Sequence, residues 1–270
     1  MKILFISLGC DKNLADSEEM LGLLTGSGHE IVDSEEEAEA IVINTCCFIH
    51  DAKEESVNTI LEMAEYKKTG KCKALVVTGC MAQRYKEEIT QEIPEVDAVL
   101  GTTSYGDIVK ALNEVQAGHV FQEFRDINEL PEDSGRRVLT TGGHFGYLKI
   151  AEGCDKHCTY CIIPSLRGSF RSVPEERLLA QAEYMASQGV KELILVAQET
   201  TVYGTDLYGR KTLHILLKKL CQIRGIRWIR VLYCYPEEIY DELIQVMKEE
   251  KKICNYLDLP IQHASDRILK

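Results

Sequence analysis

Short apolar runs alternate with segments of helical period along the chain. The first run covers residues 2–10 and ends in a cysteine, and a helical pattern over 16–28 follows it and stops at a glycine. Apolar strands separated by helices predict a mostly parallel sheet with helices on its faces, which is a Rossmann-like α/β fold. Further strands are predicted at 29–33, 38–46, 73–80 and 96–103, and further helices at 56–71, 83–93 and 105–115.

A second set of strands and helices follows residues 119–143, which are charged, rich in turn formers and without a period, and which predict a linker. Four strand–helix units resemble part of a βα barrel, although four strands cannot close one. Because the sequence stops inside a helical pattern, we expect a domain truncated at its C-terminus. The predicted strands cover 146–154, 191–200, 228–236 and 256–263, and the predicted domains are 1–118, the linker 119–143 and an incomplete barrel over 144–270.

Three cysteines end predicted strands of the first domain. Cys10, Cys46 and Cys80 each lie at the carboxyl end of an apolar run. Those ends share one edge of a parallel sheet, where ligands bind, so the three thiols are expected to converge. The alternative is that all three are buried core cysteines, since isolated cysteines usually pack as small apolar residues.

A second trio of cysteines stands in the stretch AEGCDKHCTYC, as Cys154, Cys158 and Cys161. A closed zinc site needs four ligands, and a self-contained four-iron cluster also takes four cysteines. Three thiolates therefore indicate a cluster with one iron left open for another molecule. Zinc with His157 as the fourth ligand and inert packing are the alternatives.

The CxxxCxxC spacing after a strand that opens a βα barrel resembles the signature of the radical S-adenosylmethionine (SAM) enzymes. The resemblance implies a 4Fe–4S cluster on Cys154, Cys158 and Cys161, whose open iron binds SAM for reductive cleavage to a 5′-deoxyadenosyl radical. The preceding domain with three strand-end cysteines resembles that of the methylthiotransferases. By that match Cys10, Cys46 and Cys80 hold an auxiliary 4Fe–4S cluster, which carries the sulfur to be transferred. In NTCCF, Cys47 is an alternative ligand, and Cys46 matches the family position.

Several stretches resemble the RimO branch of the methylthiotransferases more than the MiaB branch. The RimO branch modifies the β-carbon of an aspartate in a small-subunit ribosomal protein, protein twelve, and the MiaB branch modifies an adenosine of transfer RNA. The resemblance thus implies a ribosomal-protein substrate and a reductant such as flavodoxin or ferredoxin. A MiaB-type enzyme and a non-catalytic iron–sulfur scaffold remain alternatives. The stretches are SLGCDKNLADSE, INTCCFIHDAKEES, IAEGCDKHCTYCIIPSLRGSFRS and LVAQETTVYG.

Further site residues are expected near the predicted strand ends of the barrel, where cofactor contacts gather. Tyr160, between the last two cysteines, matches the family's aromatic position beside the adenine. Arg167 and Arg171 follow the cluster loop and are expected to form a solvated face, with a cofactor or substrate contact as the alternative. The expected cofactor-binding residues are Tyr160, Gln198, Glu199 and Arg230, and Tyr233, Gln262 and His263 are either contacts or ordinary rim residues.

Composition limits the remaining possibilities. Eleven cysteines in a 270-residue chain with 45% hydrophobic residues do not indicate a disulfide framework, which belongs to small secreted domains. No apolar run is long enough to cross a bilayer, and the N-terminus lacks a secretory pattern, so we expect a cytoplasmic protein without membrane contact. The net charge of −12 makes direct nucleic-acid binding an unfavoured role for this chain and suits a basic partner.

Overall fold

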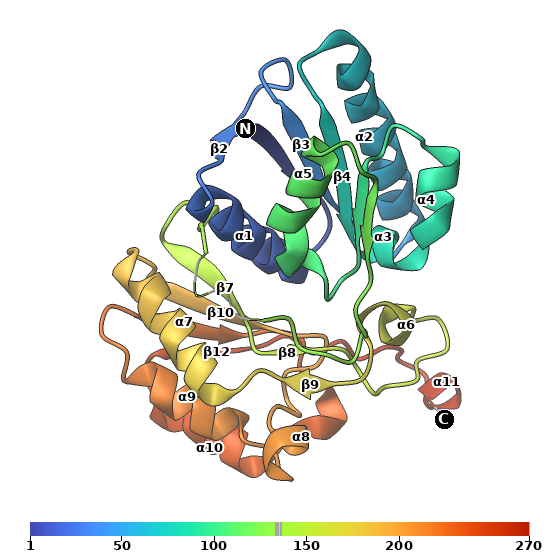
Figure 1. Cartoon of the computed structure of the whole chain (residues 1–270). Helices are drawn as coiled ribbons and strands as arrows, with labels where there is room; N and C mark the ends of the chain where they lie inside the picture. Colours follow the sequence, from blue (N-terminus) through green and yellow to red (C-terminus); the bar gives the residue numbers. More distant parts are fainter. Residues whose placement is uncertain (133–134, 136, 270) are drawn as a thin grey trace. The chain divides into compact units, whose positions relative to one another are not determined.

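The computed structural model describes residues 1–132, 135 and 137–269 of the chain. The described residues form two compact units (Figure 1). The first unit contains Met1–Val138 and Asp155–Ser169, and the second contains Leu139–Cys154 and Phe170–Lys270. The boundaries 1–118, 119–143 and 144–270 stay a prediction, because the segment Asp155–Ser169 belongs to the first unit although it follows the first strand of the second.

The first unit is built on a six-stranded sheet in the order β2-β1-β3-β4-β5-β6. All of its neighbouring strands are parallel, as the apolar runs predict. Strand β2 lies on one side of β1 and β3 on the other, so the direction of winding reverses between β1 and β3. The strands are β1 (Lys2–Ser7), β2 (Glu30–Val32), β3 (Ala40–Thr45), β4 (Ala74–Gly79), β5 (Ala98–Leu100) and β6 (Phe121–Glu123).

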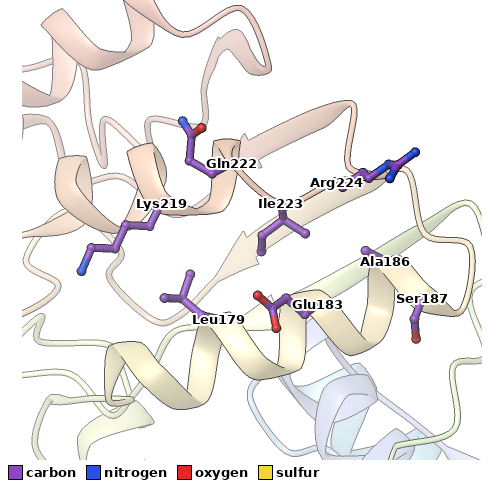
Figure 2. A pocket seen from close by; sticks show the side chains of 8 residues that line it. All are labelled: Leu179, Glu183, Ala186, Ser187, Lys219, Gln222, Ile223 and Arg224. Atoms are coloured by element: carbon purple, nitrogen blue, oxygen red, sulfur yellow. The ribbon is translucent and has the colours of Figure 1, made fainter.

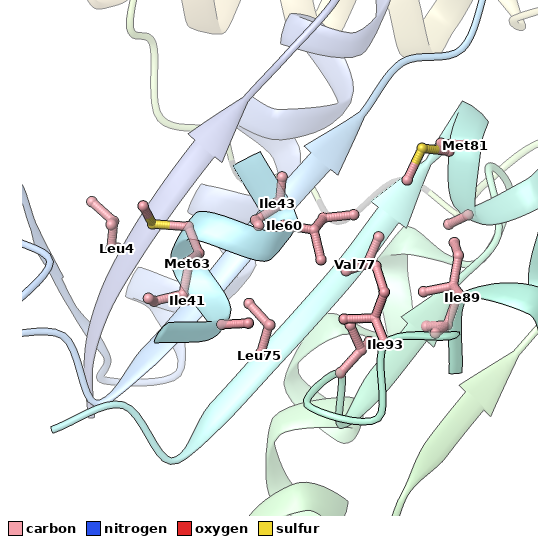
Figure 3. Close-up of a cluster of buried hydrophobic side chains, with 14 of the residues drawn as sticks. Leu4, Ile41, Ile43, Ile60, Met63, Leu75, Val77, Met81, Ile89 and Ile93 are labelled. Carbon is pink, nitrogen blue, oxygen red and sulfur yellow. The ribbon is translucent and has the colours of Figure 1, made fainter. Parts of the chain in front are cut away.

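Helices cover both faces of this sheet. Alternate residues of β3 point to opposite faces: Ile41 and Ile43 join one buried cluster, and Ala40 and Val42 join the other. The first cluster packs against α2, α3 and α4 (Figure 3), and the second against α1 and α5. The helices are α1 (Asp11–Gly26), α2 (His50–Thr69), α3 (Cys80–Arg84), α4 (Lys86–Glu92), η1 (Tyr105–Asp107), α5 (Ile108–Gln116) and α6 (Ile163–Arg167).

The second unit is built on a four-stranded parallel sheet in the order β12-β11-β10-β7. Each strand lies beside its successor and a helix connects each pair, which is the winding of a βα barrel and confirms the predicted fold class. Strands β8 and β9 form a separate antiparallel pair. The elements are β7 (Phe145–Lys149), β8 (Ala151–Glu152), β9 (Arg171–Ser172), α7 (Glu175–Ser187), β10 (Glu192–Val196), α8 (Thr205–Tyr208), α9 (Leu213–Cys221), β11 (Trp228–Val231), η2 (Pro236–Glu238), α10 (Asp241–Glu249), β12 (Ile253–Leu257) and α11 (Asp266–Leu269).

Several elements differ from the sequence pattern, among them β6 and β12. Strand β6 lies inside the predicted linker, where it pairs with β5, because three residues are too few to show a period. The last strand of the second unit begins at Ile253 and ends at Leu257, whereas the sequence predicts 256–263. The prediction of a strand up to residue 263 depends on the apolar residues Leu259 and Ile261, yet both side chains are exposed. Among the described residues, no helix combines the length and the apolarity needed to cross a membrane.

Candidate metal centres

The carboxyl ends of three neighbouring strands carry Cys10, Cys46 and Cys80. Cys10 is the third residue after β1 and stands at the N-cap position of α1, Cys46 directly follows β3, and Cys80 is the first residue of α3 after β4. Because β1, β3 and β4 are adjacent and parallel, the three residues share one edge of the sheet, as the sequence predicts. This edge includes the position between β1 and β3 where the winding reverses, and such positions are where open α/β sheets bind ligands.

Two glycines allow the backbone to turn into this edge. Gly9 and Gly79 precede Cys10 and Cys80 with φ angles of +92° and +91°, a region that other residues adopt only with strain. A Cβ on Gly79 would lie 2.3 Å from Asn44 Oδ1, and a Cβ on Gly9 would lie 2.7 Å from the Cβ of Cys46. The glycines therefore let the cysteine-bearing turns pack directly against the neighbouring strand.

The three thiols influence one another through space. Burial raises the pKa of the Cys80 thiol to about 11, the charge and hydrogen bonding of Arg167 oppose that rise, and Cys10 and Cys46 add to it. Burial also raises the pKa of Cys46, and Cys10 reinforces the effect. Within the described part of the chain, no three His, Cys, Asp or Glu side chains are already grouped as metal ligands. Three features of these cysteines suit an iron–sulfur cluster: they share one edge of the sheet, they lie near one another, and their thiolates are soft donors.

Cys46 and Cys47 occupy different environments. The Sγ of Cys46 would lie 3.1 Å from a Cβ built on Gly9, so this thiol lies beside the turn that carries Cys10. Cys47 is 2% exposed and packs in the apolar cluster under α2, α3 and α4. Burial raises the pKa of Cys47, and the nearby Arg84 opposes that rise. The surroundings of Cys47 are those of a core residue.

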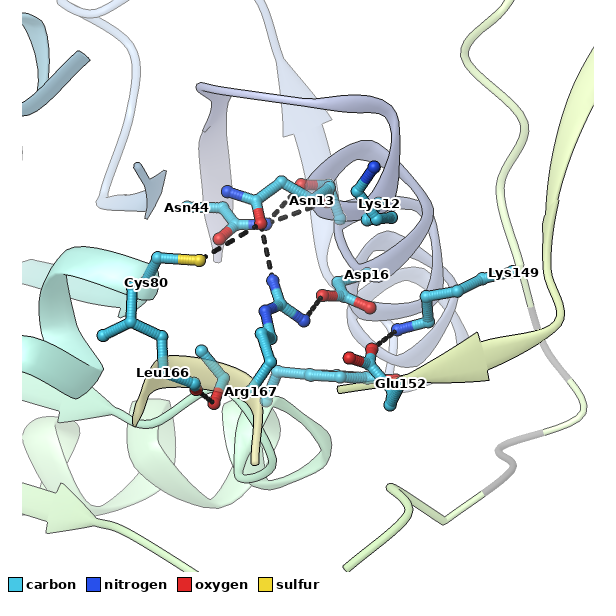
Figure 4. A network of polar contacts seen from close by, with 12 residues as sticks. Lys12, Asn13, Asp16, Asn44, Cys80, Lys149, Glu152, Leu166 and Arg167 are labelled. Carbon is cyan, nitrogen blue, oxygen red and sulfur yellow. Dashed lines mark hydrogen bonds and ion pairs between the residues drawn. The ribbon is translucent and has the colours of Figure 1, made fainter. Parts of the chain in front are cut away.

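A buried polar network underlies the strand-end thiols (Figure 4). The amide of Asn13 donates from Nδ2 to the carbonyl oxygens of Leu8 at 3.1 Å and Thr45 at 3.0 Å, which joins the ends of β1 and β3. Its Oδ1 accepts a hydrogen bond of 2.6 Å from Arg167 Nη2 and lies 3.8 Å from Cys80 Sγ. Asn44 Nδ2 donates to the Asn13 carbonyl at 2.9 Å.

Arg167 comes from the segment that carries Cys158 and Cys161. Its side chain is 3% exposed and its Nη1 donates to Asp16 Oδ2 at 2.8 Å, so the expected solvated face is wrong for this residue. The physical reason is a buried carboxylate on α1, 151 positions away in sequence, that the local pattern does not reveal. The same segment is also held by Thr102 Oγ1, which donates to the Leu166 carbonyl at 2.8 Å.

The second cysteine trio spans the boundary of the two units in sequence. Cys154 belongs to the second unit, and Cys158 and Cys161 belong to the first. A turn brings Cys161 N to 3.0 Å from the Cys158 carbonyl oxygen. Tyr160 is 73% exposed. Lys149 and Glu152 form a buried ion pair at the end of β7, just before Cys154.

The remaining expected site residues belong to the second unit. Glu199 is 2% exposed, and its Oε1 accepts hydrogen bonds from Thr201 N at 3.0 Å and Tyr235 N at 3.3 Å. This carboxylate thus ties the loop after β10 to the loop after β11. The Oε1 atom of Gln198 is buried and has no hydrogen-bond partner among the described residues. Arg230 Nε donates a hydrogen bond to Glu192 Oε1 at 2.7 Å, so the carboxylate of Glu192 already balances the charge of Arg230.

The loop after β11 contains a strained residue. Tyr233 has a φ angle of 56°, which is uncommon for a side chain larger than glycine. Its N donates to Asp258 Oδ2 at 3.1 Å and its carbonyl oxygen accepts from Thr200 N at 3.0 Å. Strained backbone held by its surroundings is typical of functional sites, and Gln262, after β12, also has a positive φ of 62°.

A shallow groove lies elsewhere, between α7 and α9 (Figure 2). It encloses about 570 Å³ and is lined by Leu179, Ile223 and polar side chains such as Glu183 and Lys219. None of the expected site residues lines it. We assign it no part in the chemistry.

Comparison with known families identifies the two parts of the chain. Residues 2–101 match a family described as the uncharacterized protein family UPF0004, and residues 148–270 match the radical SAM superfamily. A ribosomal protein uS12 methylthiotransferase RimO from Lachnoclostridium phytofermentans is 67% identical over all 270 residues. The chain is thus similar over its whole length to the RimO-type methylthiotransferases, and its second part matches the radical SAM superfamily.

Another protein of the same name is similar over the same length of the chain. The protein of that name from Clostridioides difficile is 51% identical over the whole chain. The chain covers 61% of each of these two relatives, so it spans about three fifths of their length.

Solved structures resemble the chain in fold. The radical SAM methyltransferase TsrM from Kitasatospora setae, with cobalamin and a [4Fe-4S] cluster bound, superposes with a TM-score of 0.66 at 12% identity, over 99% of this chain and 62% of that one. The cobalamin-dependent SAM radical enzyme OxsB has a TM-score of 0.60 at 12% identity, over 99% and 45%. At such identities the likeness shows the fold alone.

Proposed function

We propose that the protein is a methylthiotransferase that modifies the β-carbon of an aspartate in ribosomal protein uS12 by radical SAM chemistry. The observation that carries this proposal is the pair of cysteine trios, one at the sheet edge of the UPF0004 region and one at the start of the radical SAM region. The names of the relatives at 67% and 51% identity support the choice of substrate.

We assign one 4Fe–4S cluster to each trio. Cys10, Cys46 and Cys80 would hold the auxiliary cluster, and Cys154, Cys158 and Cys161 the radical cluster. When bound, the clusters and SAM would supply one-electron chemistry and a transferable sulfur. An unactivated C–H bond requires one-electron chemistry because it has no acidic proton. The chain supplies the remaining functions of binding, orientation and exclusion of water.

Other residues of the chain orient these groups. Asn13 fixes the turn after β1 against the end of β3 through its two carbonyl contacts. Glu199 holds the loops after β10 and β11 together. The buried Gln198 Oε1 atom can accept a hydrogen bond from an N–H or O–H group, and SAM presents both kinds. We therefore keep Tyr160, Gln198, Glu199 and Arg230 as proposed cofactor contacts.

The proposal extends to partners and location. An acidic chain of net charge −12 suits a basic ribosomal protein better than an anionic RNA. A reductant such as flavodoxin or ferredoxin would deliver the electron. We propose that the protein acts in the cytoplasm, where it would encounter both its substrate and its reductant. The domains 1–118 and 144–270, joined by 119–143, are the proposed functional parts.

Mass spectrometry in a deletion strain tests the proposal. Ribosomal protein uS12 is expected to lose the methylthio mass from one aspartate when the gene is deleted, and to regain it with the intact gene but not with the Cys158→Ala gene. Transfer RNA is expected to keep its methylthio-adenosine throughout. Loss from adenosine alone would assign the protein to the MiaB-type reaction, and SAM left unaltered by the purified, reduced protein would indicate a non-catalytic scaffold.

A further inference from the structure

A buried arginine lies next to the strand-end cysteines without being a ligand. Arg167 lies at the end of α6, six residues after Cys161, and belongs to the same unit as Cys10, Cys46 and Cys80. Two of its nitrogen atoms are directed to different partners, Nη1 to Asp16 at 2.8 Å and Nη2 to Asn13 at 2.6 Å. The side chain is thus fixed at both ends of the guanidinium plane.

The orientation of this guanidinium group has a direct electrostatic consequence. The Nη2 edge faces the Asn13 oxygen that also contacts Cys80 Sγ, whereas Asp16 takes the Nη1 edge (Figure 4). The positive group is therefore linked through Asn13 to the Cys80 thiol, and its counter-charge contacts the other edge of the guanidinium group. Asn13 Oδ1 accepts the hydrogen bond from Arg167 and lies 3.8 Å from Cys80 Sγ, so a single atom separates the guanidinium group from that sulfur.

We propose that Arg167 is a positioning residue that sets the reduction potential of the auxiliary centre held by Cys10, Cys46 and Cys80. This inference rests on the proposed function, because it needs a cluster at that edge. Arg167 presents a buried positive charge to the sulfurs and holds Asn13 in place, and Asp16 limits that charge.

The sign of the effect follows from charge. Reduction adds an electron to a centre that three thiolates already make anionic, so a nearby buried cation stabilises the reduced form and raises the potential. Hydrogen bonds and charges around the ligands are the means by which proteins tune such centres. Loss of Arg167 should lower the potential, and loss of the opposing charge on Asp16 should raise it.

A redox titration followed by electron paramagnetic resonance tests the inference on full-length protein. The parent carries Ala at positions 154, 158 and 161, so that only the auxiliary centre gives a signal. In this parent, Arg167→Gln is expected to lower the midpoint potential, Asp16→Asn to raise it, and Arg167→Lys to keep it close to the parent value. A merely structural role would not give opposite shifts for two partners of one ion pair.

Arg137 offers a matched control, because it also pairs with a buried carboxylate of α1. It is 6% exposed and its Nη2 lies 2.7 Å from Glu18 Oε2 of α1, two residues after the Asp16 that holds Arg167. Arg137→Gln should therefore destabilise the fold without moving the potential. Equal shifts for Arg137→Gln and Arg167→Gln, or no shift for either Arg167→Gln or Asp16→Asn, would overturn the inference.

The design separates failure of the inference from failure of the proposed function. A parent that binds no iron overturns the proposed function, and the inference with it. If the parent binds a normal centre whose midpoint potential changes with neither Arg167→Gln nor Asp16→Asn, the inference alone is overturned. If Arg167→Gln fails to fold, the upward shift of Asp16→Asn and the retained potential of Arg167→Lys decide the outcome.

Discussion

At the scale of single residues, neighbouring cysteines have separate roles. Cys46 Sγ lies beside the turn of Cys10, and Cys47 packs into the apolar cluster under α2, α3 and α4, to which Cys80 also belongs. Because Cys46 Sγ lies beside the turn that carries Cys10, we propose Cys46 rather than Cys47 as the ligand.

Replacement of these two cysteines gives a matched pair of variants. In the parent that lacks the second trio, Cys46→Ala is expected to abolish the iron–sulfur chromophore. Cys47→Ala is expected to retain it and to lose roughly 1 kcal/mol of stability, because it leaves a small cavity in the core. Absorption spectra after anaerobic reconstitution and thermal unfolding measure the two effects. The reverse pattern would make Cys47 the ligand.

Gly79 provides a second test at this scale. Gly79→Ala is expected to cost about 2–5 kcal/mol, because it combines backbone strain with a Cβ too close to Asn44 and Thr45. Gly28→Ala is the control, since Gly28 has a φ of +86° but no atom within 4 Å of the added Cβ. Chemical denaturation should show the larger loss for Gly79→Ala, and equal losses would contradict the close packing described here.

The positions of the strand-end cysteines can be predicted from the sequence better than the contacts that surround them. Cys10, Cys46 and Cys80 can be predicted to share an edge because parallel strands align their carboxyl ends. Arg167 and Asn13 cannot be paired in that way, because their contact joins positions 154 residues apart and depends on how α6 packs. Whether the cysteines bind clusters stays a prediction.

At the scale of elements, helix α1 buries polar side chains as well as apolar ones. Met20 and Leu24 pack on the sheet, and Asp16 and Glu18 form buried ion pairs with Arg167 and Arg137. The sequence indicates the apolar stripe of this helix, whose period is visible, but not the buried carboxylates, which look like a solvated face. Buried ion pairs are costly to break from one side, so α1 fixes both arginine-bearing segments.

Helix α9 provides a test by pH. Burial raises the pKa of the Cys221 thiol to about 11, from an ordinary value near 9. The neutral thiol is thus favoured by folding, and its contribution is complete below about pH 9 and is lost as the pH rises to about 11, by up to roughly 3 kcal/mol. In denaturant titrations, Cys221→Ala should be less stable than the unaltered protein at pH 8. It should lose less stability than the unaltered protein between pH 9 and 11. Parallel pH profiles of the two proteins would contradict this.

At the scale of the whole molecule, the apolar runs predict both parallel sheets because their strands are buried on two faces. The exceptions are short or exposed: β6 has three residues, and the false strand after β12 contains the exposed Leu259 and Ile261. The linker 119–143 cannot be fixed from sequence, because long-range packing decides which segments join a unit. The assignment of Asp155–Ser169 to the first unit has the same cause.

The account depends most on two separate iron–sulfur centres, each bound by one trio of cysteines. Iron analysis with Mössbauer spectroscopy, after anaerobic reconstitution, measures this directly. We expect about eight irons per chain, and about four when either Cys10, Cys46 and Cys80 or Cys154, Cys158 and Cys161 are replaced by Ala. About four irons in the unaltered chain, or an iron content that either set of replacements leaves unchanged, would contradict the account.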